Sequence, residues 1–218
     1  MAILRDHKRS VCHGSKWPFI ALLPMLEGRS RLGRMVMVTC LCLSLLAGGT
    51  AVAQAEGPAS AEYLIKAAFL YNFAKFVEWP SEAFKDNLSP INLYILGSDP
   101  FGEALTSIRD KTVKGRRLSI KRVNTPEEIS GCHILFVSAS EKGDLKHVLS
   151  VLKNLAILTV SDVEKFAQRG GVINFIVVDN KIHFEINPDA AQQSGLKISS
   201  QLLKLARIVS SESRKERE

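Results

Sequence analysis

The chain has 218 residues and a formal net charge of +7, but the charge is unevenly distributed. Residues 1–55 hold seven of the 29 Lys and Arg residues and two of the 22 Asp and Glu residues, which leaves residues 56–218 with a net charge of about +2. A nearly neutral domain has no electrostatic basis for binding nucleic acid, so we exclude that function. The 163 residues from 56 to 218 are enough for one domain with a substantial core.

Residues 1–55 have the features of an N-terminal extension followed by a secretory signal peptide. Basic residues from Arg29 to Arg34 precede an apolar stretch, Met35–Gly49, and Ala53-Gln54-Ala55 supplies the small residues of a cleavage site. The apolar stretch has 15 residues, fewer than the roughly 20 of a membrane-spanning helix. We therefore expect removal of residues 1–55 by cleavage near Ala55 and a mature protein in the periplasm.

Cysteine use agrees with a simple exported domain. The chain has four cysteines, and only Cys132 follows the expected cleavage point. An exported protein with one cysteine cannot form an internal disulfide. Because Cys132 begins an apolar run, we expect its side chain to be buried rather than reactive.

The stretch from Tyr63 to Pro80 is the one around which we expect the fold to be organised. It contains no glycine and no internal proline, and Pro80 ends it as a helix stop commonly does. At about 100° per residue, Phe69 and Phe73 fall on one apolar stripe. A helix that is apolar around most of its circumference must be buried on more than one side, which predicts a core-forming helix.

One face of this helix mixes polar groups with an aromatic side chain, since it carries Asn72, Lys75 and Trp79. Two interpretations are open. Trp79 either plugs the bottom of the core, or it lines a groove for a ligand or partner together with Asn72 and Lys75. Tryptophan is enriched at binding hot spots because it buries a large area and keeps a polar handle. In the second interpretation His183 and Glu185 lie opposite this face.

The rest of the chain alternates strand-like and helix-like segments. We expect strands at 91–97, 118–120, 133–137, 156–160, 172–178 and 181–186, with helical segments at 101–108, 125–128, 141–152, 162–169 and 199–208. Asp179-Asn180 is a two-residue hairpin signal between the last two strands. This alternation predicts an α/β fold: a single layered domain over 56–210, with a mainly parallel sheet flanked by helices and a C-terminal β-hairpin. Residues 211–218 form a charged tail.

Signals for enzymatic chemistry are weak. The turn Gly97–Gly102 follows a strand and opens a helix, where phosphates can bind, but it lacks the Walker lysine and the full dinucleotide glycine pattern. His183 and Glu185 point to the same face of a strand and could bind a metal or act as acid and base, although no third group stands at a diagnostic spacing. We therefore predict no catalytic residues, no metal and no cofactor. A basic cluster within 111–122 is either a solvated edge strand or a docking surface for an acidic protein.

Six phrases in order along the chain carry a family resemblance: KAAFLYNFAKFVEWP, INLYILGSDPFG, LTVSD, GGVINF, HFEIN and ISSQLLKLA. Together they resemble the YfiR-like family of periplasmic proteins over about residues 63–209. The resemblance implies a periplasmic repressor of an inner-membrane diguanylate cyclase, which contacts the cyclase's periplasmic sensor domain. It also implies a homodimer, sequestration by an outer-membrane lipoprotein, and small ligands bound near the helix that bears the Trp-Pro motif. The better-studied member of that family contains disulfides. These cannot be inferred for this chain, because Cys132 has no second cysteine with which to form a disulfide.

The main hypothesis is thus a non-enzymatic periplasmic regulator that binds the periplasmic sensor region of an inner-membrane signalling protein, lowering cyclic-di-GMP synthesis. The alternative is a periplasmic small-ligand-binding sensor or transport accessory protein, with its ligand beside Trp79. A third class, a small periplasmic hydrolase, rests only on His183 and Glu185.

Overall fold

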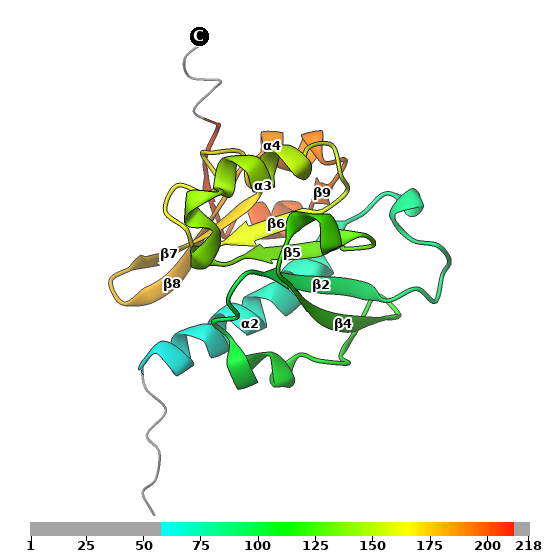
Figure 1. Cartoon of the computed structure of the whole chain (residues 1–218), viewed down its shortest axis with the longest axis horizontal. Helices are drawn as coiled ribbons and strands as arrows, with labels where there is room; N and C mark the ends of the chain where they lie inside the picture. The colour runs from blue at the N-terminus through cyan, green and yellow to red at the C-terminus, as the bar shows by residue number, and fades with distance from the viewer. Residues whose placement is uncertain (1–57, 212–218) are drawn as a thin grey trace, which may run out of the picture. The chain divides into compact units, whose positions relative to one another are not determined.

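The computed structural model describes residues 58–211, and its centre is an eight-stranded sheet (Figure 1). The strand order is β10-β8-β7-β6-β5-β2-β4-β3. The strand bounds are β2 Ile91–Leu96, β3 Thr112–Val113, β4 Arg116–Val123, β5 Ile134–Val137, β6 Leu158–Ser161, β7 Ile173–Val178, β8 Lys181–Ile186 and β10 Arg207–Ile208.

The sheet is mainly parallel, as the alternation of segments predicts. β2 is an interior strand and pairs in parallel with both neighbours, with Leu93 opposite Ile120 of β4 and Ile134 of β5. β5, β6 and β7 continue the parallel series, and β10 is parallel to β8. The antiparallel pairs are β3 with β4, and the β7–β8 hairpin. The α/β prediction with a C-terminal hairpin is therefore confirmed.

Helical segments cover both faces of the sheet. The long helix α2 (Pro58–Phe76) packs on one face, and η4 (Ala139–Gly143) with α3 (Leu145–Val151) covers the other (Figure 1). Each face has its own core cluster: Leu93 belongs to the cluster that includes α2, whereas Leu96 belongs to the cluster that includes α3. The short helices are η1 Ser81–Ala83, η2 Gly102–Ser107, η3 Pro126–Ile129, α4 Pro188–Gln193 and α5 Ser200–Leu203.

α2 is the core helix that the sequence predicts, but its ends differ from the expectation. Phe69 and Phe73 meet Phe175 and Phe184 of the hairpin in an aromatic cluster, with ring centroids 5.1–6.0 Å apart. The helix ends at Phe76, before the predicted Trp-Pro stop. It ends there because the next two residues form strand β1 (Val77–Glu78), which pairs with β9 (Lys197–Ile198).

One predicted helix is wrong, and another is shorter than predicted. Residues 163–169 form successive turns: Lys165 has a left-handed backbone (φ 60°), and the Phe166 amide donates to the Val163 carbonyl and the Asn174 side chain rather than to the carbonyl four residues earlier. The last helix, α5, ends at Leu203, and the chain then forms strand β10 beside β8. Leu205, expected on the apolar face of that helix, is 72% exposed.

Within residues 58–211, no helix combines the length and the apolar character needed to cross a bilayer. The predicted signal peptide lies outside the described residues. Cys132 is buried, as expected, and burial raises the pKa of its thiol.

Candidate functional site

A hollow of about 300 Å³ lies beside Trp79, just beyond the end of α2. The antiparallel pairing of β1 with β9 fixes the backbone immediately before this residue. The Trp79 indole N–H donates to the carbonyl of His133 at 3.1 Å, so the ring is anchored against the first residues of β5. The hollow is lined by Val77, Glu78, Trp79, Phe84, Ile91, Lys114 and Arg116.

His133 supports the aromatic side of this hollow. Its ring stacks on Phe84, with centroids 4.4 Å apart and planes 15° apart, and it meets Trp79 edge-on. The backbone N–H of Asn92 donates to Nδ1 of His133 at 3.1 Å. The proton of the neutral ring is therefore on Nε2, which donates to the Ala83 carbonyl at 3.0 Å. Burial lowers the pKa of His133, which favours the neutral ring in this arrangement.

Two cations lie at the hollow. Lys114 donates to the Val77 carbonyl at 3.0 Å, and Arg116 donates to the carbonyls of Asp86 and Ser89, each at 2.8 Å. The guanidinium carbon of Arg116 also lies 3.9 Å from the centre of the Phe84 ring. An aromatic wall beside positive charge is chemically suited to a small ligand with an apolar part and an anionic group.

The structure does not gather the predicted site residues into one groove. Asn72 and Lys75 do lie together on α2, where the lysine Nζ is 3.5 Å from the asparagine Oδ1. Lys75 also lies over the ring of Tyr71. Neither Asn72 nor Lys75 lines the hollow beside Trp79. The predicted continuous face fails because the helix ends three residues before the tryptophan.

His183 and Glu185 lie away from the hollow beside Trp79 and from the Asn72–Lys75 pair. Phe184, between them, contacts α2, so by strand alternation the two side chains point to the opposite face of the sheet. His183 is exposed, whereas Glu185 is only 1% exposed and forms an ion pair with Arg207 of β10. Among the described residues, no group of three His, Cys, Asp or Glu side chains gathers as metal ligands would.

A larger, more apolar groove runs between the N-terminal half of α2 and the β7–β8 hairpin. Its volume is about 630 Å³. Ile65 is 49% exposed and Val177 is 57% exposed, although both are large apolar side chains. The remaining lining residues are Ala61, Glu62, Phe69, Asn180, Lys181 and Ile182. Exposed apolar patches of this kind are typical of protein interaction surfaces.

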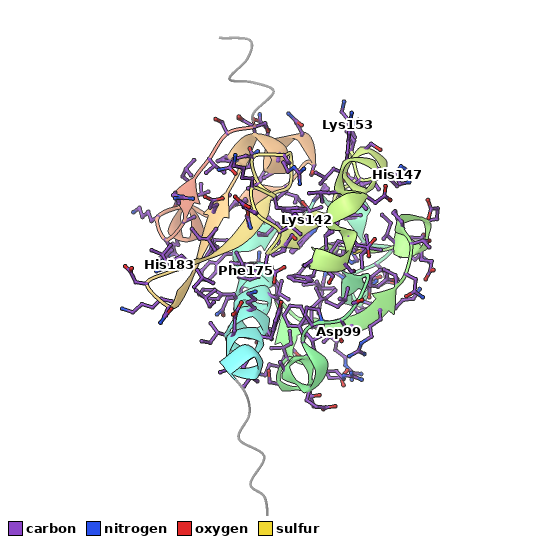
Figure 2. The ribbon with its side chains drawn as sticks, turned by 60° about the vertical axis from the view of Figure 1, so that its left-hand side comes forward. Asp99, Lys142, His147, Lys153, Phe175 and His183 are labelled. Atoms are coloured by element: carbon purple, nitrogen blue, oxygen red, sulfur yellow. The ribbon has the colours of Figure 1, made fainter. Side chains whose placement is uncertain are left out.

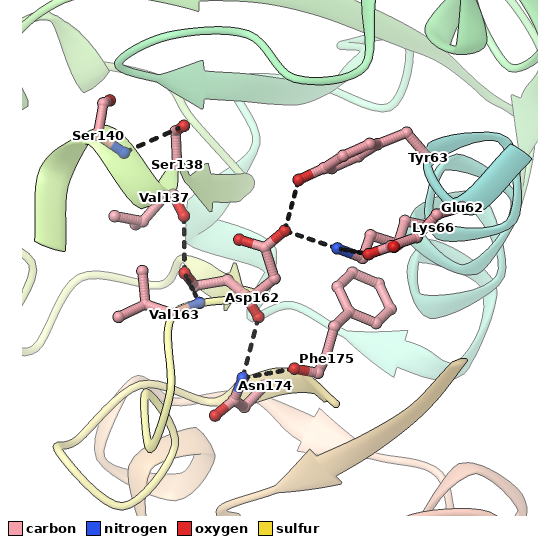
Figure 3. Close-up of polar contacts among 11 residues, drawn as sticks. Glu62, Tyr63, Lys66, Val137, Ser138, Ser140, Asp162, Val163, Asn174 and Phe175 are labelled. Carbon is pink, nitrogen blue, oxygen red and sulfur yellow. Dashed lines mark hydrogen bonds and ion pairs between the residues drawn. The ribbon is translucent and has the colours of Figure 1, made fainter. Parts of the chain in front are cut away.

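A buried polar network lies at the carboxyl end of β6 (Figure 3). The Lys66 ammonium, on α2, is 2.6 Å from both a Glu62 and an Asp162 carboxylate oxygen, and the Tyr63 hydroxyl donates to the same Asp162 oxygen at 2.8 Å. Lys66 is only 2% exposed. The other Asp162 oxygen is buried without a hydrogen-bond partner. Burial and Asp162 raise the pKa of Tyr63. These contacts tie α2 to the sheet, and no side-chain nucleophile joins them within the described residues.

The Gly97–Gly102 turn is held by its own side chains. Asp99 accepts the Phe101 amide proton at 2.8 Å and pairs with Arg122 at 2.6 Å. At Gly97, with φ 84°, a Cβ atom would collide with Ser140 and Glu141. The Asp99 carboxylate thus already accepts the Phe101 amide proton and pairs with Arg122, which gives the turn a structural role.

Residues 63–207 match the family described as DUF4154: YfiR/HmsC-like. The match covers about two thirds of the chain and includes most of the long helix, all of the sheet except Ile208, and the Trp79 hollow. The chain belongs to the YfiR/HmsC-like family. The resemblance carried by the six sequence phrases is thereby confirmed.

Similarity to solved structures is weaker than this family match. A Streptococcus pneumoniae ABC domain in complex with L-Trp is 13% identical, with a TM-score of 0.42 over 59% of this chain and 57% of that one. A conserved domain protein from Vibrio cholerae O1 biovar El Tor is 9% identical, with a TM-score of 0.42 over 67% of this chain and 59% of that one. This chain thus spans less than two thirds of either protein, and these scores support no functional argument.

Several side chains that build the sites of this YfiR/HmsC-like chain are not evident from the sequence. His133 sits in an apolar run, so its contacts with Trp79 and Phe84 depend on the pairing of distant segments. The burial of Lys66 could have been predicted from the sequence, because Lys66 is a lone charge among apolar helix residues, one turn after Glu62. A buried lysine requires a carboxylate partner, but the sequence alone does not identify Asp162 as that partner.

Proposed function

We propose that this protein is a non-enzymatic periplasmic regulator that binds the periplasmic sensor region of an inner-membrane diguanylate cyclase and represses it. The observation that carries the proposal is the match of residues 63–207 to the YfiR/HmsC-like family. The partner interface lies at the groove between α2 and the β7–β8 hairpin. Ile65 and Val177 support this placement, because each exposes about half of a large apolar side chain there.

Co-purification with detergent-solubilised membranes tests this role and this surface together. The wild-type protein should retain a membrane protein that contains a diguanylate cyclase domain. Val177→Asp places a charge in the groove and should reduce the retained cyclase at least about ten-fold, as loss of an interface hot spot does. Leu155→Asp is the matched control, because Leu155 is 41% exposed but lies outside the groove.

The outcomes separate the function from the surface. If the wild-type protein retains no membrane signalling protein, the proposed function fails. If Val177→Asp and Leu155→Asp retain the cyclase equally well, the regulator proposal stands but the groove is not its interface. Of the other proposed contacts, Asn72, Lys75 and His183 are at least partly accessible, whereas Glu185 can meet a partner only if Arg207 moves away.

The hollow beside Trp79 favours the second candidate, a small-ligand-binding sensor or transport accessory protein. An indole, a phenyl ring and two cations line it, and a small anionic aromatic molecule has the matching chemistry. Phenylacetate is a suitable probe, because it is anionic and aromatic but does not share the indole fluorescence of Trp79. Binding should change the fluorescence of Trp79, and Trp79→Phe should weaken the affinity while the protein stays folded. A protein that shows no saturable response to such molecules would argue against this candidate.

A further inference from the structure

A third cavity, of about 240 Å³, lies on the α3 side of the molecule and has a different chemistry. Three cations line it from three separate segments: Lys146 from α3, Lys153 from the loop after α3, and Arg169 from the turns before β7. Figure 2 shows Lys153 just beyond the helix that carries His147. No acidic side chain lines the cavity.

These cations differ from the basic cluster of strand β4. There, Arg117 pairs with Asp110, Arg122 pairs with Asp99, and Arg116 is bonded to backbone carbonyls. By contrast, no ion pair within residues 58–211 involves Lys146, Lys153 or Arg169. Three like charges around one hollow repel one another, and an anion bound between them would relieve that repulsion.

The rest of the lining supplies neutral polar groups. Thr159 accepts a hydrogen bond from the Val172 amide, which leaves its hydroxyl proton free to donate into the cavity. Asn154, Gln193 and Ser194 add amide and hydroxyl groups at the wall. The volume of about 240 Å³ is below the range of about 300–1,000 Å³ that is typical for drug-sized ligands, which favours a small group.

We propose that this cavity binds a small free oxyanion, either inorganic phosphate or a small molecule that presents a phosphate or carboxylate group. Arg169 is the main contact, because its planar guanidinium can donate two parallel hydrogen bonds to such a group. Lys146 contributes charge from α3, and Lys153 contributes charge from the loop that follows it. The proposal is independent of the regulatory role and of the hollow beside Trp79.

Titration of the purified protein with inorganic phosphate at low ionic strength tests the proposal, with binding measured by calorimetry. Arg169→Gln and Lys153→Gln should each weaken binding at least about ten-fold, as expected for loss of a charge-assisted hydrogen bond. Lys142→Gln is the matched control, because this exposed lysine lies on η4 outside the cavity (Figure 2) and should leave the affinity unchanged. Thermal unfolding establishes that each variant is folded.

Three results would overturn the proposal. The first is no saturable binding of inorganic phosphate by the folded wild-type protein. The second is an equal loss of affinity in Lys142→Gln and Arg169→Gln, which would mean diffuse attraction to surface charge. The third is binding to phosphatidylglycerol vesicles, but not to phosphatidylcholine vesicles or to free phosphate, which would assign the charges to a lipid surface.

Discussion

At the scale of single residues, Lys66 has the most demanding environment. Its ammonium is buried between Glu62 and Asp162, and the Asp162 carboxylate has no other cation within the described contacts. Removing one partner of a buried ion pair leaves an uncompensated charge. Lys66→Met should therefore lower the free energy of unfolding by about 3–5 kcal/mol, measured by urea denaturation.

Two variants make the Lys66 experiment specific. Lys75→Met, on the exposed side of the same helix, should change the stability by less than about 0.5 kcal/mol. Adding Asp162→Asn to Lys66→Met should recover part of the loss, because it removes the unpaired charge. Equal stability of Lys66→Met and Lys75→Met would mean that the buried network contributes nothing.

His133 predicts a pH dependence of stability. Burial and the nearby Arg116 lower the pKa of its imidazole from the usual 6.5, although the Ala83 carbonyl opposes them. At pH values below about 6.5, the unfolded chain binds more protons at this histidine than the folded chain does. The free energy of unfolding therefore falls as the pH falls through this window. The urea midpoint of the wild-type protein should fall between about pH 7 and about pH 5.5.

The His133 contribution is isolated by comparison with a second histidine. His133→Gln should show a smaller fall in the urea midpoint over the same pH range than the wild-type protein. His147→Gln removes an exposed histidine that is 4.0 Å from Glu127, and its profile should follow the wild-type profile. If His133→Gln has the same pH dependence as the wild type, the imidazole is not the titrating group.

At the scale of elements, the features set by local sequence were predictable. The hairpin is the clearest: Asp179 and Asn180 both have positive φ, 48° and 58°, as a two-residue turn with this handedness requires. The buried runs of β2, β5 and β6 were likewise evident, because strands covered on both faces are almost continuously apolar.

Elements set by distant partners were not predictable. The end of α2 depends on β1 pairing with β9, more than 100 residues later. Residues 163–169 look helical by composition, but Asn174 captures the Phe166 amide. The C-terminal segment leaves its helix because Arg207 and Ile208 find partners on β8. In each segment a hydrogen bond to another part of the chain overrides a local preference that would favour a helix; the partner is eight residues away for Phe166 and more distant in the other two segments.

The hairpin turn gives a prediction at this scale. Asn180→Val forces a β-branched residue into the left-handed conformation and should lower the free energy of unfolding by about 1–2 kcal/mol. Asn180→Gly suits the same conformation and should be as stable as the wild type or slightly more stable. Thermal or urea unfolding measures both. A valine variant as stable as the glycine variant would contradict the assigned turn.

At the scale of the whole molecule, the family and the fold class could be predicted from sequence, but the site could be predicted only in part. Trp79 does lie at a hollow, yet the neighbours expected from helical spacing are replaced by Phe84, Lys114 and Arg116. Phe84 follows in the next loop, whereas Lys114 and Arg116 come from the β3–β4 segment that only the folded sheet brings beside the tryptophan. His183 and Glu185, which share a face as strand alternation predicts, belong to the other side of the sheet.

Cellular cyclic-di-GMP tests the central claim most directly. A strain that lacks the gene should contain more cyclic-di-GMP than the parent strain, and expression of the wild-type protein with its native N-terminal segment should restore the parental level. Expression of the Val177→Asp variant should restore it less completely, provided that both proteins reach the same abundance. An unchanged cyclic-di-GMP level after deletion, under conditions in which the protein is produced, would contradict repression of a diguanylate cyclase.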